Sequence, residues 1–132
     1  CLYFENKLYR ANRTTKFNAE HFKAFGSFNY PELVESGVHL KVNYDQLWVG
    51  NKNKKLIVHK EMDTNVAILK LFPGLNRSVL QSILKIPGLK ALVLETYGAG
   101  NAPTDPWLLS DLKDAIGKGL HIVNVTQCSG GS

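Results

Sequence analysis

Cysteine is scarce in this chain, which has only Cys1 and Cys128 among its 132 residues. Two cysteines so far apart exclude a disulfide framework and a cysteine-ligated zinc cluster. We interpret both as reduced thiols, which indicates a reducing compartment. No apolar run is long enough to span a bilayer, so the sequence predicts no membrane partner.

Metal and nucleotide motifs are also missing. The four histidines are too scattered for metal-ligand spacing, so no metal site is expected. Gly98-x-Gly100 resembles the start of a dinucleotide-binding motif, but Pro103 replaces the third glycine. A tight turn is the favoured interpretation of both glycines. The sequence therefore predicts no cofactor.

Acidic residues are outnumbered, because 16 lysines and arginines face 11 aspartates and glutamates, for a net charge of +5. One interpretation is an acidic partner such as nucleic acid. The other is a lysine-rich surface without such a partner. The basic residues are scattered, whereas nucleic-acid binders concentrate charge on one face. We therefore expect no nucleic-acid partner.

The first half of the chain has an irregular, aromatic pattern. Residues 2–4 and 8–10 flank a short polar segment and predict a β-hairpin. Residues 38–42 alternate as a half-buried strand. Apolar residues 47–49 and 56–58 flank a polar turn and predict a second hairpin.

The second half alternates strands and helices. Strands are expected at 66–72, 91–94 and 121–125. Helices are expected at 77–86 and from a Thr104 cap, with Pro106 in the first turn, to about Gly117. This order predicts right-handed crossovers and a parallel sheet. The nearly all-apolar strand 91–94 predicts that helices cover both faces of that sheet.

Three loops follow the carboxyl ends of these strands, where open parallel sheets bind ligands. They are residues 72–74, 95–101 and 126–131, and the last two are rich in glycine and hydrogen-bonding side chains. Cys128 is either a nucleophile or a plain buried thiol, and no visible histidine partner favours the thiol. Asp105, Asp111 and Asp114 fit a solvated helix face.

Several segments resemble type I, cytoplasmic-type L-asparaginases. The first is Leu8-Tyr9-Arg10-Ala11-Asn12-Arg13-Thr14-Thr15-Lys16, which is similar to the lysine-bearing segment of that family. The second, Glu95 to Pro103, resembles the family's signature loop. Residues 56–59 and 123–128 also fit, in family order and at family-like spacing.

The resemblance implies an α/β fold made of two partial domains. Residues 1–43 would be the end of an N-terminal α/β amidase domain with β-hairpins, and residues 44–64 a linker or hairpin. Residues 65–132 would begin a C-terminal domain with a Rossmann-like parallel βαβαβ, three-layer architecture. The implied assembly is a homodimer or a tetramer built from dimers, located in the cytoplasm.

The implied activity is hydrolysis of L-asparagine to L-aspartate and ammonia without a cofactor. Lys16 would be the lysine of a Thr–Lys–Asp triad, and Asn101 would lie in a loop that binds substrate or approaches a neighbouring subunit. The nucleophilic threonine and the second threonine–aspartate pair are expected upstream of Cys1, so residues 1–132 alone are expected to be inactive. The Ser129–Ser132 ending fits a cut through a loop, or a flexible linker.

Two alternatives stay open at this stage. A relative with the same fold would act on glutamine, on a tRNA adduct or on another amide, whereas the second half alone would suit a non-catalytic ligand-binding module. Some type I asparaginases respond to asparagine bound away from the catalytic centre, which suggests a regulatory site at Glu95, Thr96, Thr126 and Cys128. The competing interpretation is that these side chains cap loops or meet a neighbouring subunit.

Overall fold

The computed structural model describes residues 1–131, which form two compact units. One unit is Cys1–Ile57 together with the residues from Ser129, and the other is Val58–Cys128. Neither described helix is long and apolar enough to cross a membrane.

The first unit is built from short antiparallel strands. A four-stranded sheet has the order β1-β2-β5-β6, and β3 pairs with β4 in a separate ribbon. The bounds are β1 Leu2–Phe4, β2 Lys7–Tyr9, β3 Thr15–Lys16, β4 Phe25–Gly26, β5 Val34–Ser36 and β6 Leu40–Val42. Two 3-10 turns, η1 Ala11–Arg13 and η2 Tyr44–Gln46, complete the unit.

The predicted first hairpin is confirmed. Glu5 and Asn6 both have positive φ, at 47° and 62°, and Phe4 pairs with Lys7. Two left-handed residues give the turn a twist that matches the flanking strands. The strand expected at 38–42 is shorter, at β6, and its partner β5 went unpredicted because it is only three residues long.

The hairpin predicted from residues 47–49 and 56–58 is wrong. Neither segment forms a strand, although Lys54 N–H donates to Asn51 O at 3.0 Å in a turn between them. Their apolar side chains are exposed, Trp48 by 81% and Leu56 by 91%. A two-stranded hairpin that packs against nothing gains too little apolar burial to hold its ladder.

The second unit is a parallel β-α-β-α-β arrangement, as predicted. Its sheet has the order β7-β8-β9, with Ile68, Val93 and Val123 in register. The bounds are β7 Val66–Lys70, α1 Arg77–Leu84, β8 Ala91–Thr96, α2 Pro106–Gly117 and β9 His121–Thr126. The protein therefore has an α/β fold.

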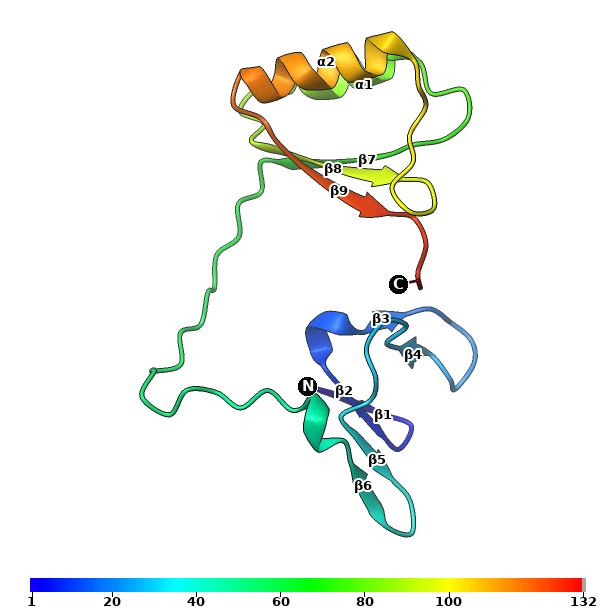
Figure 1. Ribbon diagram of the computed structural model, residues 1–132, viewed down its shortest axis with the longest axis vertical. Helices are drawn as coiled ribbons and strands as arrows, with labels where there is room; N and C mark the ends of the chain where they lie inside the picture. Colours follow the sequence, from blue (N-terminus) through cyan, green and yellow to red (C-terminus); the bar gives the residue numbers. More distant parts are fainter. Residues whose placement is uncertain (132) are drawn as a thin grey trace. The chain divides into compact units, whose positions relative to one another are not determined.

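Both helices of this unit lie side by side over one face of the sheet (Figure 1). Two right-handed crossovers that move the chain in the same direction must place their helices on the same side. The core therefore forms only on that face, from Leu69, Leu71, Leu80, Leu92, Leu94 and Leu108. The prediction of two covered faces is wrong for the described chain, where Ile68 on the other face is 65% exposed.

Local details of the helices also differ from the predictions. Thr104 does not cap α2, because the N-cap position is Asp105 and its side chain makes no capping bond. Pro106 lies at the start of α2 as expected, and α1 is capped by Asn76, whose side chain accepts from Val79 N–H at 3.1 Å. Ile116, expected on the apolar face of α2, is 56% exposed.

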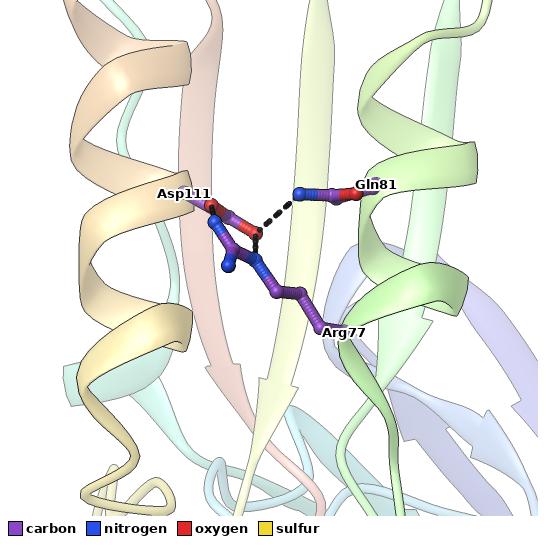
Figure 2. Close-up of polar contacts among 3 residues, drawn as sticks. All are labelled: Arg77, Gln81 and Asp111. Atoms are coloured by element: carbon purple, nitrogen blue, oxygen red, sulfur yellow. Dashed lines mark hydrogen bonds and ion pairs between the residues drawn. The ribbon is translucent and has the colours of Figure 1, made fainter.

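Asp111 was expected on a solvated face, yet it is only 9% exposed between the two helices. Arg77 donates to both of its carboxylate oxygens, at 2.9 and 2.8 Å, and Gln81 donates at 3.3 Å (Figure 2). The hydrogen bonds from Arg77 lower the pKa of Asp111. At pH values above about 3.9, the pKa of an aspartate in the unfolded chain, this ion pair therefore stabilises the fold. The stabilisation is lost as the pH falls through the lowered pKa of Asp111 in the folded protein.

Candidate functional site

Lys16 lies in the first unit, in the two-residue strand β3. It pairs with Phe25 across the ribbon, and Thr15 pairs with Gly26. The side chain is exposed, and its Nζ lies 5.9 Å from the centroid of the Phe25 ring. That ring packs edge-on against Phe4 at 4.9 Å, which fixes its position. The ammonium group therefore faces solvent from a ribbon that the Phe4–Phe25 pair holds on the same face.

The segment before Lys16 is held by a cluster around Tyr30. The Arg10 guanidinium lies 4.6 Å from the Tyr30 ring centroid and donates to Gln46 O at 2.8 Å. The Tyr30 hydroxyl donates to the same carbonyl at 3.1 Å. Thr14 Oγ1 donates to Arg10 O at 2.8 Å, which closes the turn of η1. Both ends of the turn that precedes Lys16 are thus fixed.

The second unit gathers polar side chains at the carboxyl edge of its sheet. Thr96 Oγ1 donates to Asn124 Oδ1 at 2.8 Å, and Thr96 is 1% exposed. The Gln127 amide donates to Leu71 O at 2.7 Å and to Glu95 O at 2.9 Å. These carbonyls lie where β7 and β8 end, and Glu95 O also accepts from Leu71 N–H at 2.9 Å, so the Gln127 amide links the two strand ends.

The loops after β8 and β9 meet, as predicted. Thr126 Oγ1 donates to Gly98 O and accepts from Cys128 N–H at 3.0 Å. Gly98 and Gly100 have φ of 42° and 103°, and Tyr97 exchanges backbone hydrogen bonds of 2.8 Å with Asn101. Left-handed glycines that close such a tight loop confirm the predicted tight turn.

The predicted effector residues are not all brought together. Glu95 and Thr96 are successive residues of β8, so their side chains point to opposite faces of the sheet. Thr96 faces the helices and is buried, whereas Glu95 lies on the open face, in register with Lys70. Thr126 and Cys128 do lie together. Cys128 is a free, exposed thiol, so its predicted burial is wrong.

Comparison with known proteins assigns both parts of the chain. Residues 1–48 match the family described as Asparaginase, N-terminal, and residues 65–132 match the Glutaminase/Asparaginase C-terminal domain. The chain belongs to the asparaginase family. The resemblance of the chain to type I asparaginases is thereby confirmed.

Individual relatives match nearly the whole chain, and two of the three described next are named asparaginases. L-asparaginase 1 of Escherichia coli K12 is 39% identical over 98% of this chain and 38% of its own length. The 60 kDa lysophospholipase of Mus musculus is 42% identical over the whole chain and 23% of its own length. The crystal structure of L-asparaginase I from Vibrio cholerae superposes with a TM-score of 0.86 and 34% identity, over 96% of this chain and 38% of that one.

The chain thus spans between about a quarter and two fifths of the length of these relatives. The two matched regions leave residues 49–64 between them, and this stretch contains the segment that forms no strand. The domain limits 1–43, 44–64 and 65–132 stay a prediction.

Sequence reasoning missed the residues that hold the η1 turn of the first unit and the carboxyl edge of the sheet in the second. Tyr30 and Gln46 are far along the chain from Arg10, and nothing in their spacing indicates that they meet. Gln127 was noted only as a loop residue, although a glutamine directly after a parallel strand is well placed to bond the carbonyls of neighbouring strands.

Proposed function

We propose that the whole protein is an L-asparaginase that hydrolyses L-asparagine to L-aspartate and ammonia, with Lys16 in its catalytic machinery. The observation that carries the proposal is the match of both asparaginase domain families to one chain that contains the lysine-bearing segment 8–16. The ordered η1 turn and the exposed ammonium of Lys16 support a role for that segment in chemistry.

The proposed mechanism is covalent. A threonine hydroxyl, supplied from outside residues 1–132, attacks the side-chain amide carbon of asparagine and forms a C–O bond. The amide C–N bond then breaks, the nitrogen takes up a proton and ammonia leaves. Water attacks the resulting ester, and aspartate is released with the threonine regenerated. Lys16 would assist proton transfer to and from the threonine hydroxyl, and preorganised backbone donors would stabilise the oxyanion.

The remaining assignments follow from the same proposal. Asn101 is exposed in the loop closed by Tyr97, and we assign it to substrate binding or to contact with a neighbouring subunit. The assembly would be a homodimer or a dimer of dimers, and the reaction would need no cofactor. The two free thiols fit a reducing compartment, which supports a cytoplasmic location.

The decisive experiment is a substrate comparison with the whole protein. Ammonia release is measured from asparagine and from glutamine, and fatty-acid release from a lysophosphatidylcholine, because one relative is named a lysophospholipase. We expect asparagine to give the highest kcat/KM. Preference for glutamine would instead favour the related amidase alternative. Fatty-acid release without ammonia release would refute the asparaginase assignment.

We further propose a regulatory asparagine site at the carboxyl edge of the second unit. The Glu95 carboxylate would bind the ammonium group, and Thr126 and Cys128 would contribute the polar loop above β9. Thr96 would act from beneath, through its hydrogen bond to Asn124. A regulatory role requires that binding at this site changes the free energy of binding at the catalytic site.

Steady-state kinetics test this site. Wild-type protein is expected to give a sigmoidal asparagine curve, and Glu95→Ala and Thr126→Val to make it less sigmoidal, because each removes a ligand contact or the loop tie to Gly98. Thr104→Val is the matched control, since Thr104 is exposed in the loop between β8 and α2. A hyperbolic wild-type curve, or a sigmoidal curve that neither variant alters, would end the proposal.

A further inference from the structure

A single tyrosine connects three separate segments of the first unit. Tyr30 stacks on the guanidinium of Arg10 and shares the acceptor Gln46 O with it, at 3.1 and 2.8 Å. Gln46 ends η2, so its carbonyl is free of any helical bond of its own and accepts two donors. The arrangement places a cation on an aromatic face and fixes both groups to one point of the backbone.

A second guanidinium lies against the same ring. Arg13 is 5.7 Å from the Tyr30 centroid, three residues after Arg10 on η1. Its backbone N–H donates to Arg10 O at 2.9 Å, and Thr14 Oγ1 donates to that same carbonyl. Tyr30 therefore contacts both arginines of the turn, which holds residues 10–14 as one piece.

Lys16 follows this turn by two residues, and its ribbon is also held by the Phe4–Phe25 pair and by the hydrogen bond from Phe17 N–H to Ala24 O at 2.9 Å. Its strand β3 is two residues long, and the β3-β4 ribbon is separate from the four-stranded sheet. A ribbon this short is marginally stable by itself. The side chain of Lys16 is exposed and touches the Phe25 ring only at 5.9 Å. These contacts hold β3 from β4 onward, whereas the anchored turn fixes the direction in which the chain enters β3.

We propose that Tyr30, acting with Arg10, is a positioning residue for the catalytic Lys16. This inference rests on the proposed function, because it assumes that Lys16 takes part in the reaction. Small displacements of a catalytic group are costly, since a shift of about 1 Å lowers rates by about 100-fold. Tyr30 contacts neither Lys16 nor reacting atoms in this role, so its effect must pass through the turn.

The competing explanation is that the cluster only attaches η2 to the rest of the unit. In that case loss of the tyrosine ring would lower stability without a specific effect on turnover. The two explanations differ in how Tyr30 and Lys16 variants combine. A residue that acts through Lys16 has nothing left to position once Lys16 is replaced.

The experiment uses the whole protein and measures kcat and KM for asparagine. Tyr30→Ala is expected to lower kcat by about 10- to 100-fold with KM changed less than about threefold. Tyr30→Phe keeps the ring under both arginines and is expected to stay within about threefold of wild type. Tyr44→Ala is the matched control, because Tyr44 is 75% exposed in the neighbouring turn. Near-UV circular dichroism at the assay temperature confirms that each variant is folded.

The double variant decides between the explanations. Tyr30→Ala in a Lys16→Met background is expected to be no slower than Lys16→Met alone. Independent, multiplying losses would overturn the positioning role, and so would a folded Tyr30→Ala protein with wild-type kcat. If Lys16→Met itself retains wild-type activity, the catalytic role of Lys16 fails first. Loss of activity in Lys16→Met but not in Tyr30→Ala removes only the present inference.

Discussion

Replacement of Lys16 by methionine in the whole protein is expected to lower the rate of asparagine hydrolysis by about 10²- to 10⁴-fold. The reason is chemical, since methionine keeps most of the side-chain length but has no ammonium group to transfer or orient a proton. The fold should tolerate the change, because Lys16 is exposed. A thioether also packs favourably against an aromatic ring such as Phe25.

The measurement is ammonia release under saturating asparagine, with the unfolding midpoint recorded for each variant. Lys23→Met is the matched control, because Lys23 is an exposed lysine of the same unit. It should retain wild-type turnover. A Lys16→Met protein within threefold of wild type would refute the assignment, whereas equal losses in both variants would point to a general effect of charge removal.

A pair of neighbouring leucines in α2 should differ sharply in their effect on stability. Leu108 is 1% exposed and lies in the core cluster with Leu80 and Leu92, whereas Leu109 is 61% exposed. Leu108→Ala is expected to lower the free energy of unfolding by about 2–5 kcal/mol, from lost burial and the cavity left behind. Leu109→Ala should change it by less than about 0.5 kcal/mol.

Urea unfolding of residues 1–132, followed by circular dichroism, checks this difference. The two variants share the same chemical change and adjacent helical positions, so the small preference of alanine for helices cancels between them. Equal losses at both positions would contradict the placement of the core on the face that α1 and α2 cover.

Much of the second unit follows from the sequence because its signals are local. Pro73-Gly74 and Pro87-Gly88 separate apolar strands from an amphipathic helix, and strands joined by helices pair in parallel. The first unit is harder, because its strands have two or three residues and carry no measurable period. Residues 47–58 show the opposite case, in which a hairpin is predicted but absent. The two apolar triplets have the composition of strands, but their side chains are exposed and pack against no other element.

For the candidate site, too, the sequence indicated some residues and the structure alone showed others. Lys16 was singled out because its segment resembles the asparaginase lysine segment, whereas the contacts that hold the preceding turn join Arg10, Tyr30 and other residues that are distant in the chain. The sequence shows that Glu95 and Thr96 are neighbours, but it does not show that the strand expected at 91–94 extends to include both. Once β8 is known to extend to Thr96, the strand period places the two on opposite faces.

The sequence by itself determined the asparaginase kinship, the parallel pairing of β7, β8 and β9, and the glycine turn after β8, because each depends on short local patterns along the chain. The tertiary structure decided which polar groups are already engaged. The sequence predicts Asp111 on a solvated helix face, but in the structure Arg77 of the other helix bonds to it. The sequence places Thr96 in a loop, but in the structure its hydroxyl bonds to Asn124. Such pairings depend on packing that brings together residues about 30 positions apart, and periodicity along the chain carries no record of it.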